Sequence, residues 1–331
     1  MKRACLFLLL FALIFSTNAS ADSLLEVRFL DVGNADAALI LCDGHAMLID
    51  GGNKSDSQRL YSLLKKEKIR SLDIVVATHV HVDHIGGLPG ALNYSDAEIV
   101  LCPVKSHSSD AFNDFKKYAN KNGPGISIPL AGDTYALGSA TIEVLALNSG
   151  SAINETSIVL RLEHGNVSFL FTGDAEGDTE QALLDSDIDL SATVLKVAHH
   201  GKDTSSSTRF LQAVAPSHSV ISTKDEPASI VLDNLQAVGS EVYRTDLHGD
   251  VSFISDGERV FVSTEKSLAI APVTVETKKE VTYILNINTE KFHHPSCKSV
   301  VDMKEKNKRE FSGTREEAIS KGYKPCKNCD P

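Results

Sequence analysis

Apolar residues recur along this chain with two different periods, and the alternation between the periods indicates the fold class. The early part of the chain has the pattern of strands joined by short turns, with Asp43-Gly44 as a hairpin signal. Residues 55–68 then carry leucines at helical spacing, which predicts a surface helix with one buried face. The strands predicted in the first half cover residues 26–32, 37–42, 46–50, 72–77 and 99–101.

The second half of the chain repeats this alternation. Further strands are predicted at residues 141–147, 157–162, 167–172, 193–198 and 219–222, and near Val242, Val251 and Val260. Further helices are predicted at residues 110–120, 178–184, 205–214 and 230–238. Sheets of mixed direction with helices on their outer faces indicate an α/β protein with an αββα sandwich.

The composition agrees with a folded protein of one large and one small domain. Apolar residues make up 42% of the 331 residues and charged residues 23%, which excludes a disordered chain. Residues 269–281 have no clear period and contain Pro272. We therefore predict a linker at residues 266–281 between a domain at 22–265 and a small domain at 282–331.

The strand predicted at residues 72–77 leads directly into a histidine-rich stretch. Thr78 is followed by His79, His81, Asp83 and His84. Three imidazoles and a carboxylate within six residues place nitrogen and oxygen ligands around one point at the end of the strand. A coincidental polar loop would crowd these side chains together without partners. The stretch therefore predicts a metal site for two ions.

This stretch resembles the HxHxDH signature of metallo-β-lactamase fold hydrolases. Residues 48–52 resemble the early Asp-Gly turn of that superfamily, and residues 172–174 resemble the segment with its bridging aspartate. Residues 196–201 resemble the segment with its later histidine. Within the superfamily, Phe-Leu-Asp-Val-Gly at residues 29–33, Asp36 and the paired histidines are most similar to the hydrolase domain of ComEC-type DNA-uptake proteins. The resemblance covers residues 25–264 and also implies the αββα sandwich.

The resemblance implies two metal ions that share one carboxylate. The implied ligands are His79 and His81 for one ion, Asp83, His84 and His199 for the other, and Asp174 as the bridge. Many members have another histidine before the bridging aspartate, where this chain has residues 154–157, Asn-Glu-Thr-Ser. One ion therefore lacks a nitrogen ligand, which makes Mn²⁺ a candidate beside Zn²⁺.

A pair of ions suits the chain to hydrolysis, because the ions activate a water and neutralise charge on the substrate. Asp83 is expected to orient the water while it binds metal. Two roles stay open for His200, which is either the group that protonates the leaving oxygen or an alternative metal ligand. His248 is a further candidate for the last ligand, although a turn residue is the favoured interpretation. Lys196 and residues 205–207 either bind substrate phosphate or belong to a solvated loop.

The first residues have the features of a secretory signal peptide. Lys2 and Arg3 precede an apolar run at residues 4–15, and small residues lead to a cleavage site after Ala21. A membrane anchor is the alternative, but the run is shorter than the ~20 residues that span a bilayer. We expect an extracellular or periplasmic protein that is not inserted in the membrane after cleavage.

Cleavage would leave an acidic protein with a basic tail. Without Lys2 and Arg3, 31 Lys and Arg residues face 44 Asp and Glu residues, a net charge of −13. Residues 278–331 instead hold 12 basic and 8 acidic residues, a net charge of +4. An acidic protein needs cations or a separate basic element to approach a polyanion. Export also raises the question of disulfides, and Cys42 and Cys102 are predicted to be either buried thiols or one disulfide.

The tail carries a second metal-binding pattern. His293 and Cys297 lie four residues apart, and Cys326 and Cys329 form a CxxC pair, which is the spacing of a structural zinc site. A redox pair or a disulfide with Cys297 is the alternative. A domain of about fifty residues has room for only a small core, so a metal ion is expected to stabilise it.

The tail resembles the zinc-binding module of Ada-type DNA repair proteins, in which four cysteines hold the ion. Here His293 stands at the first cysteine position, so repair activity is not implied. The tail also carries a group of basic residues that form either a polyanion-facing surface or an ordinary solvated face: Lys304, Lys306, Lys308, Arg309 and Arg315.

These features together favour a secreted metal-dependent phosphodiesterase, a nuclease that acts on extracellular DNA and uses its tail to hold the backbone. The same metal site is compatible with another ester or amide substrate, such as a cell-wall phosphodiester, a lactone or a β-lactam. A DNA-binding protein with a decayed site is a third, non-catalytic alternative. The oligomeric state stays open.

Overall fold

The structure is a computed structural model, and it describes residues 23–186, 188–266, 281–313, 315–329 and 331. The chain divides into two compact units, Met1–Leu268 and Ala269–Pro331, called here the main unit and the tail unit. The predicted signal peptide and nearly all of the predicted linker lie outside the described residues. Within the described part of the chain, none of the helices has the length and apolar character needed to span a membrane.

The main unit is built on two sheets. The strands of the first sheet are β1 (Leu25–Phe29), β2 (Ala38–Cys42), β3 (His45–Ile49), β4 (Ser71–Val76), β5 (Asp96–Leu101), β6 (Ile126–Ser127), β14 (Val251–Ser255) and β15 (Val260–Thr264). They lie in the order β15-β14-β1-β2-β3-β4-β5-β6. β3 to β6 run parallel, whereas β1 pairs antiparallel with both β2 and β14.

The second sheet has the same mixed character. Its strands are β7 (Thr134–Leu137), β8 (Ala140–Ala146), β9 (Val159–His164), β10 (Val167–Phe171), β11 (Val194–Lys196), β12 (His218–Ile221) and β13 (Glu241–Arg244). They lie in the order β13-β12-β11-β10-β9-β8-β7, with β10 to β13 parallel. The carboxyl ends of β10 and β11 therefore meet at one edge, where their loops lie side by side.

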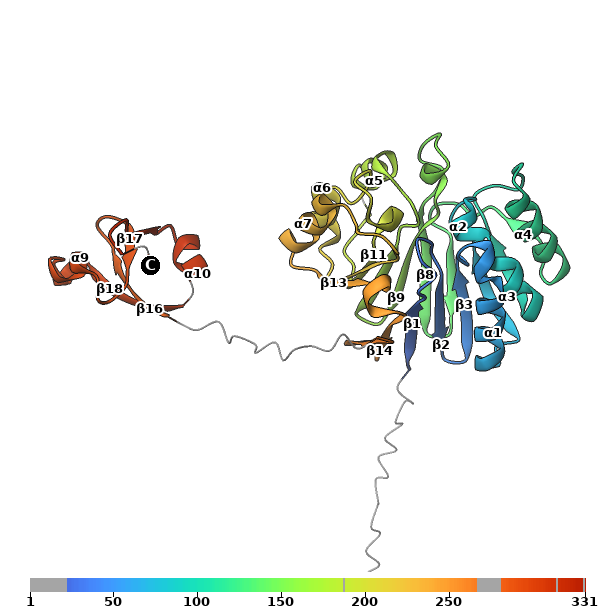
Figure 1. Cartoon of the computed structure of the whole chain (residues 1–331), viewed down its shortest axis with the longest axis horizontal. Coiled ribbons are helices and arrows are strands. Elements are labelled where there is room, and N and C mark those ends of the chain that lie inside the picture. The colour runs from blue at the N-terminus through green and yellow to red at the C-terminus, as the bar shows by residue number, and fades with distance from the viewer. Residues whose placement is uncertain (1–22, 187, 267–280, 314, 330) are drawn as a thin grey trace, which may run out of the picture. The chain divides into compact units, whose positions relative to one another are not determined.

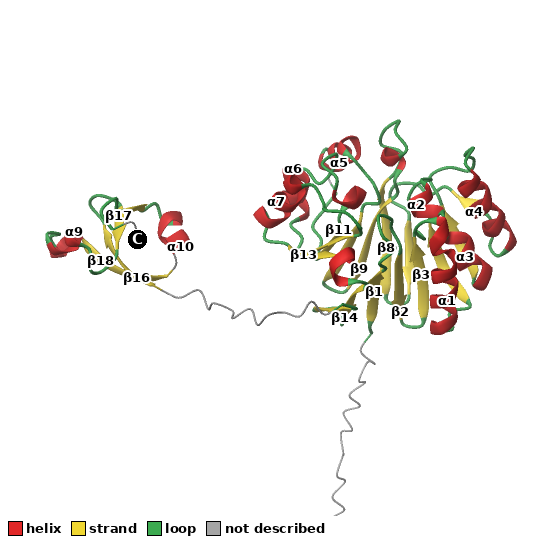
Figure 2. Cartoon of the chain, viewed as in Figure 1, coloured by secondary structure: helices red, strands yellow, loops and turns green. Residues whose placement is uncertain are grey.

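Helices cover the outer faces of both sheets. Figure 1 shows α1, α3 and α4 on one side of the sandwich and α5, α6 and α7 on the other, and Figure 2 shows the strands between them. The bounds are α1 (Ser57–Glu67), α2 (Val82–Ile85), α3 (Leu88–Tyr94), α4 (Asp110–Lys121), α5 (Gly177–Leu184), α6 (Thr208–Val214), α7 (Ser229–Ala237) and α8 (Thr245–His248). The predicted αββα sandwich is confirmed.

Three apolar clusters hold these layers together. One fills the space between the sheets and includes Phe29, Phe169 and Phe253, which pack edge to face. The second lies under α1, α3 and α4, and the third lies under α5, α6 and α7. Leu60 and Leu64 of α1 belong to the second cluster, as their helical spacing predicts.

Cys42 and Cys102, the cysteines in the described part of the main unit, are buried thiols. Cys42 lies in the cluster between the sheets and Cys102 in the cluster under the first set of helices. Both are free and buried, so the disulfide alternative is not supported. Burial raises the pKa of the Cys102 thiol to about 12, which keeps it protonated.

The tail unit is a small sheet with short helices. Its elements are β16 (Val281–Asn286), β17 (Lys291–His293), α9 (Lys298–Val301), β18 (Lys308–Gly313), α10 (Arg315–Ser320) and β19 (Lys324–Pro325). The strands lie in the order β18-β16-β17-β19. One small cluster is formed by Tyr283, Leu285, Phe292 and Ala318, and a second includes the buried Cys297 and Cys326. The apolar core of the tail unit is small, as expected for a unit of this length.

Candidate metal centre

Loops at one edge of the sandwich bring the predicted ligands together. The loop after β4 carries His79 and His81, and α2 follows it at the end of the strands (Figure 1). Asp174 follows β10, and His200 lies in a short 3₁₀ segment, Ala198–Gly201, after β11. The backbone N–H of Asp36 donates to the carbonyl of Asp83 at 3.1 Å, which ties the loop before β2 to this edge.

One group of side chains has four members: Asp83, His84, Asp174 and His200. Their ligand atoms all lie within 4.8 Å of one another. His84 Nε2 is 3.2 Å from Asp174 Oδ1, and His200 Nε2 is 3.7 Å from the same oxygen. These three buried atoms have no hydrogen-bond partner. Buried polar atoms normally have one, so this convergence fits a cation that the three atoms bind together.

A second group consists of His79, His81 and Asp174. His79 Nε2 lies 3.0 Å from His81 Nδ1 and 3.7 Å from Asp174 Oδ2. Asp174 therefore turns one carboxylate oxygen toward each group, which is the arrangement of a bridging ligand. The residue types and spacings of both groups fit a pair of metal ions.

Buried acceptors hold two of the imidazoles in place. His84 Nδ1 lies 2.9 Å from Asp50 Oδ2, so this nitrogen carries the proton and Nε2 faces the cluster. Asp50 is held in turn by Thr78, whose backbone N–H and hydroxyl both donate to it. His200 Nδ1 donates to the carbonyl of Ser222 at 2.9 Å. Such partners orient metal-binding histidines and raise their basicity.

Asp36 and Lys196 form a buried ion pair behind these imidazoles. Lys196 Nζ lies 2.8 Å from Asp36 Oδ2, and both side chains are almost completely buried. Asp36 Oδ1 lies 3.6 Å from His200 Nδ1. Lys196 is therefore neither a substrate contact nor part of a solvated loop, which were the two predicted alternatives. Lys196 shares a face of β11 with Val194, which belongs to the cluster between the sheets, so its side chain points between the two sheets.

The electrostatics of the cluster favour a cation. Burial would lower the pKa of His84, but the carboxylates of Asp174 and Asp50 outweigh it and raise the pKa well above 6.5. Burial and the charge on His84 lower the pKa of His79 well below 6.5, so His79 is neutral. Burial would raise the pKa of Asp83, but the neighbouring His200 imidazole and the charge on His84 lower it to about 2. The carboxylates of this cluster give it an excess of negative charge, which attracts a cation.

The structure places His200, not His199, beside Asp83 and His84. The resemblance implies His199 as the ligand here, but both histidines have a left-handed backbone, with φ of 49° and 54°. The chain therefore turns sharply, and consecutive side chains point to different sides of Asp174. His199 Nδ1 lies 2.8 Å from Glu176 Oε1 instead. The buried position of His200 favours its role as a ligand over that of a proton donor.

Two further candidates do not join the centre. His248 Nδ1 lies within hydrogen-bonding distance of the Arg244 backbone in the α8 turn, which agrees with the turn interpretation. Ser207 caps α6 by accepting from the Phe210 backbone N–H.

Sequence reasoning also missed Glu155, whose buried carboxylate accepts from the backbone N–H groups of Asp178 and Thr179 at the start of α5. Its signal was the unusual acidic residue in the segment that lacks the family histidine.

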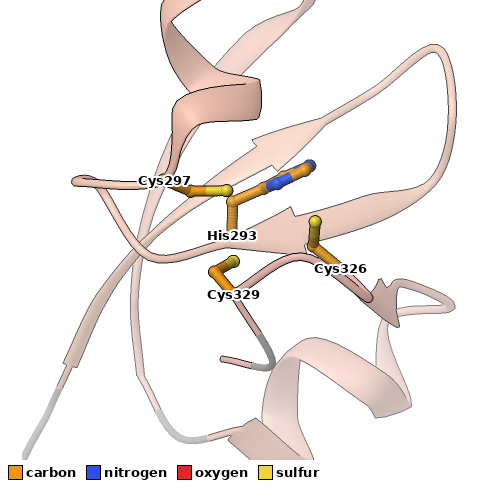
Figure 3. Close-up of side chains that lie close together, drawn as sticks. All are labelled: His293, Cys297, Cys326 and Cys329. Atoms are coloured by element: carbon orange, nitrogen blue, oxygen red, sulfur yellow. The ribbon is translucent and has the colours of Figure 1, made fainter.

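The predicted ligands of the tail unit also converge. His293 ends β17, Cys297 precedes α9, and Cys326 and Cys329 follow β19, and all four point toward one another in Figure 3. Their ligand atoms lie within 4.8 Å of one another. Both ring nitrogens of His293 are buried without a hydrogen-bond partner, and the three thiols are free. This donor set fits a tetrahedral zinc ion.

The fold and the edge centre together define a metal-dependent hydrolase. The profile of the metallo-beta-lactamase superfamily matches residues 30–223, which is more than half of the chain. The chain belongs to the metallo-beta-lactamase superfamily. The profile of the metal binding domain of Ada matches residues 277–331. Both resemblances predicted from the motifs are thereby confirmed.

Curated relatives include a ComE operon protein and a competence protein. ComE operon protein 3 of Bacillus subtilis is 27% identical over 253 residues, which are 69% of this chain and 33% of that protein. Competence protein ComA of Neisseria gonorrhoeae is 26% identical over 236 residues, 69% of this chain and 32% of that protein. The chain thus spans about a third of the length of these relatives. These matches confirm the ComEC-type resemblance.

Two other similarities are shorter or more distant. Zinc phosphodiesterase ELAC protein 1 of Mus musculus is 30% identical over 103 residues, 28% of each chain. Among solved structures, the metallo-beta-lactamase fold protein YhfI from Bacillus subtilis has a TM-score of 0.47 at 13% identity, and the match covers 72% of this chain and 100% of that chain.

Proposed function

We propose that this protein is a phosphodiesterase that cleaves DNA with two metal ions. The observation that carries the proposal is the position of Asp174, which offers Oδ2 to one ligand group and Oδ1 to the other. His79 and His81 would bind the first ion, and Asp83, His84 and His200 the second. Zn²⁺ suits the histidines, and Mn²⁺ suits the carboxylates of Asp83 and Asp174.

Residues of this chain would have separate roles around such ions. Two bound ions would neutralise phosphate oxygens and lower the pKa of an attacking water. Asp83 is suited to orient that water, because a pKa of about 2 keeps it ionised and its side chain is 27% exposed. Lys202, exposed at the same edge, is suited to bind a phosphate oxygen. Lys196 is excluded from that role by its buried pairing with Asp36.

DNA is the proposed substrate because several independent features agree on it. The relatives include ComE operon protein 3, a competence protein and a zinc phosphodiesterase. The tail matches the metal binding domain of Ada and carries the basic residues noted above. Export by the predicted signal peptide would place the enzyme where extracellular DNA is found. The tail would then hold the backbone while the main unit cuts it.

The test is degradation of plasmid and single-stranded DNA by purified protein loaded with Mn²⁺ or Zn²⁺. His84→Ala should abolish cleavage, whereas His248→Ala, outside both ligand groups, should retain it. Turnover of bis-p-nitrophenyl phosphate and not of nitrocefin would separate phosphoryl from acyl chemistry. Loaded protein that leaves DNA and RNA intact would contradict the proposal.

A further inference from the structure

The first ligand group is one member short. It has His79, His81 and Asp174, whereas the second group has four members. The segment that lacks the family histidine forms a short 3₁₀ turn, Asn154–Thr156, beside the centre. Its Asn154 Nδ2 lies 3.5 Å from His199 Nε2. An imidazole is therefore already present beside this segment, although it comes from another loop.

The two carboxylate oxygens of Asp174 each lie near a different pair of histidines. Oδ1 has His84 Nε2 and His200 Nε2 as its imidazole neighbours, at 3.2 and 3.7 Å. Oδ2 has His79 Nε2 and His199 Nε2, at 3.7 and 3.8 Å. Each carboxylate oxygen thus faces two imidazoles. His199 lies on the side of Asp174 that His79 occupies, and not on the side of His84.

His199 also has the partner that a metal-binding histidine usually has. Its Nδ1 lies 2.8 Å from Glu176 Oε1, and Thr204 bonds to both groups. Because a carboxylate only accepts, Nδ1 carries the proton and Nε2 has a free electron pair. The ammonium of Lys202 donates to that pair at 2.8 Å. A positive charge thus already sits at Nε2, on an exposed side chain that is free to move away.

The backbone explains how adjacent residues reach opposite sides of one carboxylate. His199 and His200 both have positive φ, and Gly201 continues with φ of 78°. Residues other than glycine adopt this conformation at an energetic cost, and such strain is typical of functional sites. The backbone N–H of His199 donates to the carbonyl of Gly173 at 3.2 Å, which holds the turn next to Asp174.

We propose that His199 is the fourth ligand of the ion bound by His79, His81 and Asp174, and that Glu176 positions it. The two adjacent histidines would then serve different ions, with His199 in the place of the missing family histidine. This inference rests on the two-metal site of the proposed function. It does not depend on the substrate.

The test is metal content of full-length variants after dialysis at limiting free Zn²⁺, measured by mass spectrometry. We expect three ions in the wild type, two in the main unit and one in the tail unit. His199→Ala and His79→Ala should each hold two, and the double variant should also hold two, because both residues serve one ion. The double variant of His199→Ala with His84→Ala should hold one. The proposal would be overturned if the double variant with His79→Ala held one ion and the double variant with His84→Ala held two. Three ions in His199→Ala would also overturn it.

Two controls separate a ligand from a structural residue. Circular dichroism should show that every variant keeps its fold, and His248→Ala should hold three ions. Glu176→Gln should keep the ligand but lose its carboxylate partner, so the first ion should bind about tenfold more weakly. An unchanged affinity in that variant would overturn the role of Glu176. Wild-type protein with three ions that cleaves no DNA would contradict the proposed function and leave this inference standing.

Discussion

The candidate metal sites of the main unit and of the tail unit are built in different ways. In the main unit the ligands are spread over residues 79–200, and two sheets with three apolar clusters position their loops. In the tail unit the four ligands lie within residues 293–329, around two small clusters. The main unit therefore has a core that does not need a metal ion, whereas the tail unit has little else to stabilise it.

The ligand atoms of the two units also differ, in agreement with this contrast. The tail unit offers three thiols and one imidazole, a complete tetrahedral set that leaves no position for a substrate. The main unit offers imidazoles and carboxylates, several of them oriented by a buried partner. A metal ion in the tail unit would thus serve structure, whereas metal ions in the main unit would serve chemistry.

The largest expected effect is unfolding of the tail unit without zinc. Structural zinc contributes roughly 10–16 kcal/mol of apparent binding free energy in small domains. A chelator with reductant, or Cys326→Ser, should remove amide protection from residues 281–331 in hydrogen exchange and leave the strands of the main unit protected. A truncation after Glu265 should lose one tightly held zinc. Protection of the tail without metal would contradict the comparison.

The next largest effect is expected from the buried ion pair of Asp36 and Lys196 in the main unit. Lys196→Met would leave Asp36 without its partner in the interior, which costs roughly 3–5 kcal/mol of unfolding free energy. Urea denaturation should show this loss in the main unit alone. Lys66→Met, on the exposed face of α1, is the matched control and should change stability little. Equal stability of the two variants would show that the pair contributes nothing.

A smaller effect is expected from the residue that orients His84. Asp50→Asn keeps the shape of the side chain but removes the carboxylate from His84 Nδ1, so metal affinity should fall by roughly 10–100-fold. Competition with a chromophoric chelator would measure it. Asp73→Asn breaks another carboxylate–histidine pair, with His45 at 2.6 Å, in the same sheet. That variant should bind metal normally, and an affinity loss in both would argue against a specific role for Asp50.

The smallest effect is a pH dependence that differs between metal-free and metal-loaded protein. The carboxylates of Asp174 and Asp50 raise the pKa of His84 above 6.5, against the effect of burial. This contribution to stability is complete below pH 6.5 and is lost as pH rises through the higher folded pKa. The Tm of the metal-free main unit should therefore fall as pH increases above 6.5. Metal competes with the proton, so the loaded protein should not show this fall. Calorimetry of both forms checks the difference, and parallel curves would contradict it.

Much of the fold could be predicted because its signals are local. The helical spacing of Leu60 and Leu64 and the apolar run before Thr78 each report burial of a neighbouring face, whatever that face packs against. The short β6 and the edge strand β7 were missed, because an edge strand needs little apolar alternation.

The candidate site could be predicted only in part. Residues 79–84 form the loop after β4 and the first residues of α2, so their proximity follows from the sequence alone. Which side of Asp174 each of His199 and His200 faces could not be decided from the sequence, since it depends on the sign of φ at two consecutive residues. The burial of Lys196 also escaped prediction, because it depends on the other sheet, which packs over that face of β11.

The amino-acid sequence by itself determined the kinds of elements, the inventory of metal-binding side chains and the division into a large and a small unit. Hydrophobic periodicity and ligand spacing decide these properties over a few residues. Tertiary structure decided which imidazole faces which oxygen of Asp174, and that Asp36 and Lys196 lie buried behind them. Those distances join loops from different sheets, so they are set by the packing of the whole sandwich and not by any one segment.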